Sequence, residues 1–406
     1  MATGHAPLPD FVAIEGLRIG VANAGIKQTA RPDITVFELA DTASVAGVFT
    51  KNAFCAAPVQ LCRQHLSAGG AIRYLLVNTG NANAGTGSLG MDNALASLAA
   101  LAELAGAGVQ QILPFSTGVI GEHLPVEKIS QALPAALACL SADNWAAAAS
   151  AIMTTDTRPK GVSRSIDIAG HTVTINGISK GAGMIKPNMA TMLAFVALDA
   201  VVSPALLQQM VAEACRLSFN RITIDGDTST NDSAILVATG KGSLDADALG
   251  QQDLRLLQQA INLVFVELAQ LIVRDGEGAT KFVHVHVSGG CSEQECEQVA
   301  FTIAESPLVK TALFASDPNW GRILAAVGRS GIVDLDVDKV SLAINQVLIA
   351  ENGGRAASYT EQAGVAALAP EDIHIEVNLC RGDAAATVWT TDLSHDYVTI
   401  NAEYRT

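Results

Sequence analysis

Short β-rich hydrophobic runs alternate with turn residues over the first 80 residues of the chain. Such runs, bounded by glycine and polar turn residues, predict β-strands. The predicted strands lie in IEGLRIGVANAG, ITVFELA, SVAGVFT and YLLVNTG. The spacing then changes, because leucines recur at helical positions in MDNALASLAALAELAG, and this predicts a helix. Two further helical patterns precede residue 153, in PVEKISQALPAALACL and ADNWAAAASAIM.

The rest of the chain repeats this order of strands and helices. Strands are predicted in SRSIDIAG, HTVTINGISKG and ATMLAFVALDA, then in NRITIDGD, AILVATG, KFVHVHVSG, VSLAINQVLIAENG, IHIEVNLCRG and AATVWTTDL. Helices are predicted in SPALLQQMVAEACRLS and DLRLLQQAINLVFVELAQLIV, and Gly170 is expected at a hairpin turn. Because strands group with strands and helices with helices, a layered α+β architecture is expected rather than a strict βαβ alternation.

Composition places the chain among globular proteins of one large or two smaller domains. Its 406 residues are 49% hydrophobic and 16% charged, which excludes a disordered or fibrous chain. A net charge of -15 argues against a nucleic acid or an anionic membrane as partner, because both require basic patches. No secretory signal is visible in MATGHAPLPDF, and no apolar run reaches the roughly 20 residues of a membrane helix. An acidic cytoplasmic enzyme is therefore expected.

The sequence offers little support for a metal site or for disulfides. Its seven cysteines are odd in number and scattered, and the pair in CSEQEC lacks the spacing of a zinc knuckle, so reduced thiols are expected. The stretch DGDTSTND begins like a calcium loop, but Thr230 stands where the loop requires glycine and Leu236 where it requires glutamate. His284 and His286 are expected to share one face of a strand, and without a third ligand this indicates an ordinary surface.

The stretch KGAGMIKPNMATMLAF places Thr191 between a segment with glycine and proline and a run that predicts a buried strand. One interpretation is an ordinary strand entrance, since threonine favours strands. The other is self-cleavage of the Ala190–Thr191 bond, for which the small Ala190 is suitable. The freed α-amino group, with a usual pKa of about 7.7 to 8.0, then serves as the base for its own hydroxyl nucleophile.

Two other segments supply groups that this chemistry needs. An oxyanion hole requires donors in a turn, and PFSTGVIGEHLP offers Thr117 and Gly118, although a plain loop before a helix explains the same residues. Lys180 ends a predicted strand, where it is either solvated or close to Thr191. Glu277 in DGEGATK is either a helix cap or a carboxylate for a substrate ammonium group. The glycine-rich NTGNANAGTG lacks nucleotide-binding spacing and is interpreted as a polar loop beside a site.

Taken together, these motifs resemble the ornithine acetyltransferase family, also called glutamate N-acetyltransferase. The resemblance runs in order from about residue 78 to the C-terminus, in the blocks STGVIGE, TTDT, SKGAGMIKPNMATMLAF, DGDTSTND, VRDGEGATK and DLSHDYVTINAEYRT. It implies that the chain cleaves itself before Thr191 and that the α chain 1–190 and β chain 191–406 fold together as one catalytic unit. Thr191 would accept acetyl from N2-acetyl-L-ornithine and pass it to L-glutamate in a ping-pong cycle.

The resemblance also assigns roles to individual residues. Thr117 and Gly118 match the family's oxyanion donors, and the substrate-binding positions match Thr154, Lys180, Thr191, Glu277, Asn401 and Thr406. An amino-acid substrate carries an ammonium group suited to Glu277 and a carboxylate suited to Lys180 and polar donors such as Asn401. A C-terminal residue that binds substrate is consistent with an ordered strand and turn at the end of the chain.

The family's fold is an α/β sandwich with central β-layers covered by helices, and its cleaved protomers associate as an α2β2 heterotetramer. No metal or tightly bound cofactor is expected, while the use of acetyl-CoA as a second acetyl donor stays open. Two alternatives also stay open. A related self-processing aminopeptidase or amidase would give its acyl group to water, and a non-catalytic binding protein would keep the Ala190–Thr191 bond intact.

Overall fold

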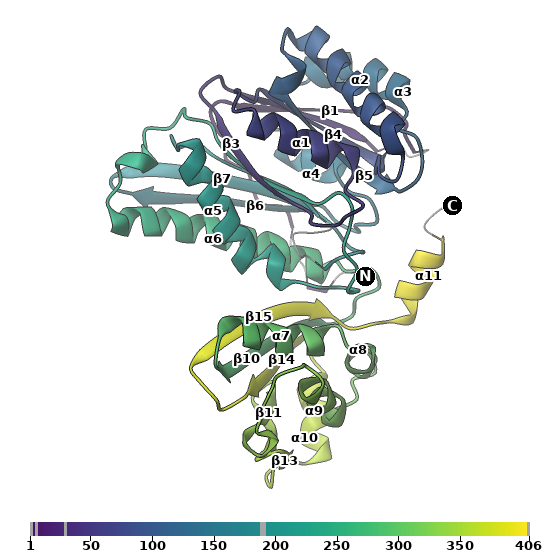
Figure 1. The fold of residues 1–406 in the computed structure, drawn as a ribbon, viewed down its shortest axis with the longest axis vertical. Coiled ribbons are helices and arrows are strands. Elements are labelled where there is room, and N and C mark those ends of the chain that lie inside the picture. Colours follow the sequence, from purple (N-terminus) through teal and green to yellow (C-terminus); the bar gives the residue numbers. More distant parts are fainter. Residues whose placement is uncertain (1–2, 5–6, 28–30, 187–191, 404–406) are drawn as a thin grey trace. The chain divides into compact units, whose positions relative to one another are not determined.

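The structure is a computed structural model that describes residues 3–4, 7–27, 31–186 and 192–403. Ala190, Thr191 and Thr406 therefore lie outside the described residues. The chain divides into two compact units, which are described separately (Figure 1). The larger unit comprises Pro7–Asn220 and Thr228–Ile272, and the smaller unit comprises Met1–Ala6, Arg221–Asp227 and Val273–Thr406.

The first sheet of the larger unit has four strands in the order β1-β2-β4-β5. Strand β2 is antiparallel to both of its neighbours, β1 and β4, whereas β4 and β5 run parallel. Their bounds are Leu17–Ala22 (β1), Ile34–Leu39 (β2), Tyr74–Asn81 (β4) and Ile112–Val119 (β5). Helices α2 (Gly87–Ala105) and α3 (Val126–Ala138) pack on the outer face of this sheet through a cluster that includes Leu98 and Leu133.

The second sheet of the larger unit has five strands in the order β3-β9-β8-β7-β6. Their bounds are Ser44–Phe49 (β3), Ser233–Ala238 (β9), Leu193–Leu198 (β8), His171–Lys180 (β7) and Lys160–Ile168 (β6). Helix α5 (Pro204–Leu217) packs on β3 and β9. Helix α6 (Gln251–Arg274) approaches β7 closely at Gly177, where an added Cβ would lie 2.8 Å from Leu268.

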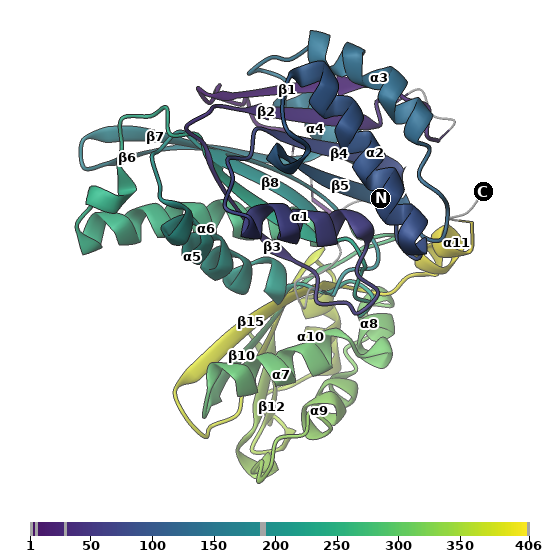
Figure 2. The ribbon, with the colours of Figure 1, turned by 45° about the horizontal axis from the view of Figure 1, so that its top comes forward.

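The two sheets of the larger unit face each other across an apolar core (Figure 2). Phe195 of the second sheet packs against both Phe37 and Phe115 of the first, with 5.0 Å between ring centroids in each case. Helices α1 (Ala57–Ser67) and α4 (Trp145–Ala151) contribute to the same core. The larger unit is thus a sandwich of two β-layers covered by helices, and the predicted layered architecture is confirmed.

Helix α6 is the one helix in the described part of the chain that is long and apolar enough to cross a membrane. Half of its most apolar stretch is buried inside the protein, as in the core helix of a globular domain. This burial agrees with its packing against β7.

The smaller unit contains a six-stranded sheet in the order β13-β12-β11-β14-β10-β15. The strand bounds are Phe282–Gly290 (β10), Ser341–Ile344 (β11), Val347–Glu351 (β12), Gly354–Arg355 (β13), Asp372–Asn378 (β14) and Ala384–Thr391 (β15). An apolar core joins one face of this sheet to four helices. These are α7 (Glu293–Ala304), α8 (Pro307–Phe314), α9 (Trp320–Gly328) and α10 (Glu361–Leu368), and the last helix of the unit is α11 (His395–Glu403).

Most predicted strands and helices are confirmed, including the turn at Gly170, whose φ is +83°. The strand predicted in NRITIDGD is wrong, because a short 3-10 helix at Phe219–Arg221 is followed by irregular chain with one bridge from Ile222 to Trp389. Ile222 and Ile224 of this stretch are buried, but they lie outside the named strands. The strand and turn expected near the C-terminus are also wrong, because the helix α11 occupies that position.

Candidate active site

Two of the predicted site residues of the larger unit meet at the ends of their strands. Lys180 is the last residue of β7, and Thr117 lies near the end of β5. The Lys180 ammonium Nζ donates to Thr117 Oγ1 over 3.2 Å, and the two residues are only 6% and 9% exposed. The alternative of a solvated lysine at a strand end is therefore wrong. A buried cation beside a buried hydroxyl can stabilise negative charge at this point.

Gly118 lies on β5 and not in the turn that the sequence predicted. Its φ is +135°, and an added Cβ would lie 2.3 Å from the carbonyl carbon of Gly80 on β4. The β4–β5 register shifts between Gly80 and Asn81 at the same point. Only glycine fits here, so the strand ends in an irregular backbone rather than in a regular ladder.

A buried ion pair ties the TTDT block to the segment after Lys180. Asp156 and Lys160 form it over 2.6 Å, and both side chains are fully buried. The Asp156 carboxylate also accepts hydrogen bonds from the backbone N–H groups of Thr154, at 2.9 Å, and Gly181, at 2.7 Å. Burial acts to raise the pKa of Asp156, but the charges of Lys160 and Lys180 and the Gly181 amide outweigh it and hold the pKa well below its usual value.

The DGDTSTND block supplies two further buried polar side chains next to these residues. Asn231 Nδ2 donates to the backbone carbonyls of Ser116, at 2.9 Å, and Ala82, at 2.6 Å, and so connects the chain before Thr117 to the loop after β4. Asp232 follows directly and is 3% exposed. Burial raises the pKa of Asp232 well above its usual value, although the charge of Lys180 acts in the opposite direction.

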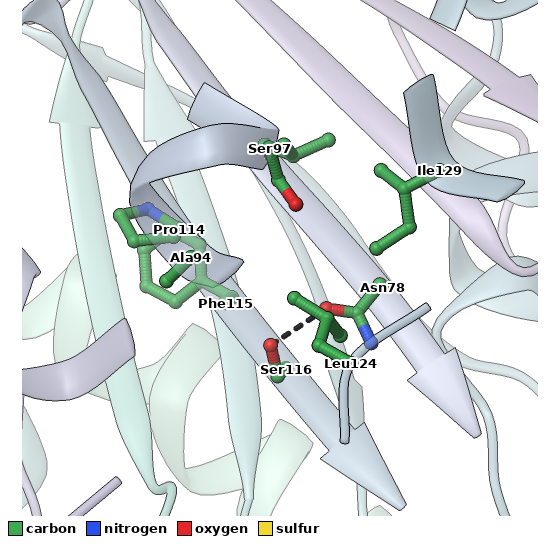
Figure 3. Close-up of a pocket in the computed structure, with 9 residues that line it drawn as sticks. Asn78, Ala94, Ser97, Pro114, Phe115, Ser116, Leu124 and Ile129 are labelled. Atoms are coloured by element: carbon green, nitrogen blue, oxygen red, sulfur yellow. Dashed lines mark hydrogen bonds between the residues drawn. The ribbon is translucent and has the colours of Figure 1, made fainter. Parts of the chain in front are cut away.

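A small cavity lies behind the ends of β4 and β5, on the side of α2 and α3 (Figure 3). Its polar lining consists of Asn78, Ser97 and Ser116, and Ser116 Oγ donates to Asn78 Oδ1 over 2.6 Å. Its free volume of about 10 Å³ is near the smallest that holds one water molecule. The cavity is too small for an amino acid, and its hydrogen bond instead fixes the chain that leads to Thr117.

The predicted site residues of the smaller unit also lie together. Asn401 Nδ2 on α11 donates to Glu277 Oε2 over 2.7 Å, and Glu277 is 8% exposed. The sequence predicted Glu277 as a helix cap or as a carboxylate for a substrate ammonium group, and neither prediction included its hydrogen bond to Asn401. The neighbouring Tyr397 hydroxyl donates to Asp225 Oδ2 over 3.3 Å. Burial, Asp225 and Glu277 together raise the pKa of Tyr397, so this hydroxyl stays protonated.

Asp392 holds the loop that carries Glu277. Its Oδ1 accepts from the backbone N–H groups of Thr280, at 2.8 Å, and Lys281, at 3.0 Å, while its Oδ2 accepts from Thr280 Oγ1, at 2.5 Å. Gly278 has a φ of +68°, and an added Cβ would lie 2.5 Å from Ser394 Oγ. The loop therefore has one well-defined backbone, which sets the position of the Glu277 carboxylate.

The predicted residues thus fall into three groups. Thr117, Gly118, Thr154 and Lys180 lie in the larger unit, and Glu277 and Asn401 lie in the smaller unit. Ala190, Thr191 and Thr406 lie outside the described residues. The sequence did not reveal Asp156, Lys160, Asn231 or Asp232 as site residues. Among the described residues, no group of three or more histidine, cysteine, aspartate or glutamate side chains could hold a metal ion.

Comparison with known proteins gives matches over the whole chain. A family model described as the ArgJ family matches residues 18–406. The arginine biosynthesis bifunctional protein ArgJ of Pseudomonas fluorescens is 58% identical, and the match covers 100% of this chain and 100% of that protein. The protein of the same name from Pseudomonas syringae pv. tomato is 57% identical, again over 100% of each chain.

Two similar solved structures match shorter parts of the chain. The crystal structure of the arginine biosynthesis bifunctional protein ArgJ from Bacillus halodurans is 37% identical, with a TM-score of 0.47, over 50% of this chain and 95% of that chain. Ornithine acetyltransferase from Mycobacterium tuberculosis, complexed with ornithine, is 30% identical, with a TM-score of 0.38, over 43% of this chain and 93% of that chain.

Proposed function

This chain belongs to the ArgJ family, and we propose that it transfers acetyl from N2-acetyl-L-ornithine to L-glutamate through an acetylated Thr191. It is an acetyltransferase of arginine biosynthesis. The family is the one that the motifs around Thr191 predicted. The observation that carries the chemical proposal is the buried contact between Lys180 and Thr117, because it prepares a site for developing negative charge.

The first reaction in the proposal is self-cleavage. The Thr191 hydroxyl attacks the carbonyl carbon of Ala190, and the peptide bond is replaced by an ester, which water hydrolyses. The products are the chains 1–190 and 191–406, and the second begins with a free α-amino group on its nucleophile. That amine accepts the hydroxyl proton in the later transfer reaction.

Acetyl transfer then takes place in two half-reactions, acetylation of Thr191 and transfer of its acetyl group to L-glutamate. Thr191 Oγ attacks the acetyl carbonyl of N2-acetyl-L-ornithine and releases L-ornithine, and the amine of L-glutamate next attacks the acetyl ester. Thr117 and Gly118 stabilise the oxyanion in both steps, and Lys180 strengthens the Thr117 hydroxyl as a donor through their 3.2 Å contact. Both half-reactions therefore use one set of groups.

Substrate binding in the proposal uses two buried charged groups, the Lys180 ammonium and the Glu277 carboxylate. Thr154, Lys180, Glu277, Asn401 and Thr406 are the binding residues. The Glu277 carboxylate suits an ammonium group, and Asn401 keeps that carboxylate oriented through its 2.7 Å bond. The ammonium of Lys180 suits the α-carboxylate that ornithine and glutamate share.

We also propose a second activity and an assembly. Acetyl-CoA would acetylate Thr191 in place of N2-acetyl-L-ornithine, in keeping with the word bifunctional in the names of the two Pseudomonas relatives. Two copies of each cleaved chain would form a cytoplasmic α2β2 heterotetramer. Each reaction moves the acetyl group on the protein itself, so the proposal requires no metal and no resident cofactor.

The intact mass of the denatured protein tests this proposal, before and after incubation with N2-acetyl-L-ornithine. We expect two fragments that divide before Thr191, and one acetyl group added to the fragment that begins there. One uncut mass that never gains acetyl would refute both the cleavage and the intermediate. Release of acetate that exceeds transfer to saturating L-glutamate would favour an amidase instead.

A further inference from the structure

Side chains satisfy the open edge of β5, the strand that carries Thr117. β5 is the last strand in the order β1-β2-β4-β5, so in the described part of the chain one of its edges has no neighbouring strand of this sheet. Helix α1 packs on the first part of this edge. Its His65 Nδ1 donates to the carbonyl of Ile112 over 2.8 Å. Its Cys62 Sγ donates to the carbonyl of Pro114 over 3.1 Å.

Asn231 continues this row at the carbonyl directly before Thr117. Its Nδ2 donates to the carbonyl of Ser116 over 2.9 Å. The same nitrogen donates to the carbonyl of Ala82, in the loop after β4, over 2.6 Å. One side chain therefore holds the ends of β4 and β5 together where the register between the two strands shifts.

The Asn231 amide has a single defined orientation. Asn231 is 7% exposed, and its Oδ1 accepts from Thr230 Oγ1 over 2.5 Å, so both ends of the amide are in use. It lies two residues before β9, a strand of the second sheet of the larger unit. A buried and fully satisfied amide at this point connects the two sheets in one fixed geometry.

Thr117 depends on this connection because the backbone around it is irregular. The next residue, Gly118, has a φ of +135°, so a regular ladder does not continue past Thr117. Lys180 Nζ contacts Thr117 Oγ1 over 3.2 Å and fixes its side chain. An oxyanion donor has to lie about 3 Å from the developing charge, and a shift of about 1 Å can cost roughly 100-fold in rate.

We propose that Asn231 is a positioning residue for acetyl transfer, because it holds the Ser116 carbonyl and thereby places the Thr117 hydroxyl. The inference rests on the proposed function, in which Thr117 is an oxyanion donor. Both hydrogens of the Asn231 amide are used on backbone carbonyls, so the residue acts through Thr117. The oxyanion exists only in the transition state and the intermediate, so Asn231 should affect kcat more than KM.

The test is the steady-state kinetics of Asn231→Ala with N2-acetyl-L-ornithine and L-glutamate, with rates expressed per cleaved chain from intact mass. We expect kcat to fall roughly 10- to 100-fold. The KM for N2-acetyl-L-ornithine should stay within about threefold, because both half-reactions use the same donor and slow together. An unchanged kcat, or a raised KM with an unchanged kcat, would overturn the proposal.

Asn144→Ala is the matched control. Asn144 Nδ2 also donates to two backbone carbonyls, those of Ile19 and Cys139, each over 2.8 Å. Ile19 lies on β1, at the opposite edge of the same sheet, so this variant loses a similar double link away from Thr117. Its kcat should stay within twofold of the wild-type value. Melting temperatures report how much stability each variant loses.

A double-mutant cycle tests whether Asn231 acts through Thr117. In a Thr117→Ala background, Asn231→Ala should lower kcat by less than about threefold, because the group that it positions is already absent. A further loss of the full size seen in the single variant would show that Asn231 acts independently of Thr117, and the proposal would be wrong.

Thr230→Val decides the question if Asn231→Ala is uncut or unfolded. Valine keeps the branched shape but removes the hydroxyl that orients the Asn231 amide. We expect kcat to fall roughly 3- to 10-fold, the usual range for one hydrogen bond, and an unchanged kcat would refute the role of Asn231. A wild-type protein that transfers no acetyl to L-glutamate would instead refute the proposed function itself.

Discussion

The two units each bury an aspartate among lysines and hydroxyl groups, but they satisfy it to different degrees. Asp392 in the smaller unit uses both oxygens, which accept from Thr280 and Lys281. Asp232 in the larger unit leaves Oδ2 without a partner in the described part of the chain. A carboxylate with both oxygens in use ties loops together, whereas one with a free oxygen leaves part of its hydrogen-bonding capacity unused.

Substitutions at fully satisfied buried charges should destabilise the fold, whereas substitutions at reacting groups should slow the reaction. Asp392 and the Asp156–Lys160 pair hold backbone segments, so their loss should first appear in stability. The loss of a residue that supplies only a reacting group should first appear in rates.

Thr191→Ala should abolish both self-cleavage and acetyl transfer, because no hydroxyl nucleophile remains. Intact mass should show one uncut chain that gains no acetyl group from N2-acetyl-L-ornithine. Thr172→Ala, at an exposed position on β7, is the control and should be cut normally. A processed and active Thr191→Ala protein would contradict the proposed mechanism.

Lys160→Met should cost about 3–5 kcal/mol in the free energy of unfolding, because the buried Asp156 carboxylate loses the partner of its ion pair. Urea unfolding measures this loss. The control is Arg164→Met on the same strand, which removes an exposed pair with Glu267 and should cost at most about 1 kcal/mol. Equal losses in the two variants would mean that burial of the first pair has no energetic consequence.

Lys310 in the smaller unit should make stability depend on pH. It is buried and donates to Thr390 Oγ1 over 3.0 Å and to the carbonyl of Thr391. Burial lowers the pKa of Lys310 to about 8, below its value in an unfolded chain. The unfolded state therefore binds more protons between pH 8 and 10.5, and the free energy of unfolding rises across this window.

The measurement compares the wild type with Lys310→Met in urea at several pH values. The difference in unfolding free energy, wild type minus variant, should grow by about 3 kcal/mol from pH 8 to 10.5. Taking the difference cancels the other titrating groups that the two proteins share. A difference that stays constant with pH would show that Lys310 keeps its charge in the folded protein.

Glu277→Ala should leave self-cleavage intact and weaken substrate binding. The lost charge-assisted contact with an ammonium group is expected to raise KM for N2-acetyl-L-ornithine roughly 10- to 100-fold. Steady-state kinetics measures this, and intact mass verifies normal processing. Glu361→Ala is the control, because Glu361 lies on α10 and bonds Tyr359 instead. Uncut Glu277→Ala protein would place Glu277 in the cleavage reaction.

The spacing of hydrophobic residues predicted much of the fold, because buried side chains recur at the period of the helix or strand that carries them. The leucines of α2 and the apolar face of α6 made those helices visible in the sequence, and the same holds for strands such as β10. The pattern failed at NRITIDGD, where Ile222 and Ile224 are buried without a strand ladder. It failed again at α11, whose residues show no buried face among those described.

The site was only partly predictable, because buried charge leaves no simple pattern. Lys180 and Thr117 were identified by motif, but their contact joins positions 63 residues apart. Asp156 and Asp232 were missed because charged residues are expected at the surface unless they are paired. The DGDTSTND block was weighed as a calcium loop and counted among the family motifs, but neither interpretation predicted that Asn231 and Asp232 are buried.

Strands β7 and β8 pair from Ile175 opposite Leu198 to Lys180 opposite Leu193, and the bond proposed for cleavage lies between them in the sequence. Once that bond is cut, this ladder joins two separate polypeptides. Refolding then becomes a second-order reaction, and the melting temperature depends on protein concentration. Dilution would thus weaken the fold of each processed protomer, whereas the fold of each uncut Thr191→Ala protomer would depend on a single chain.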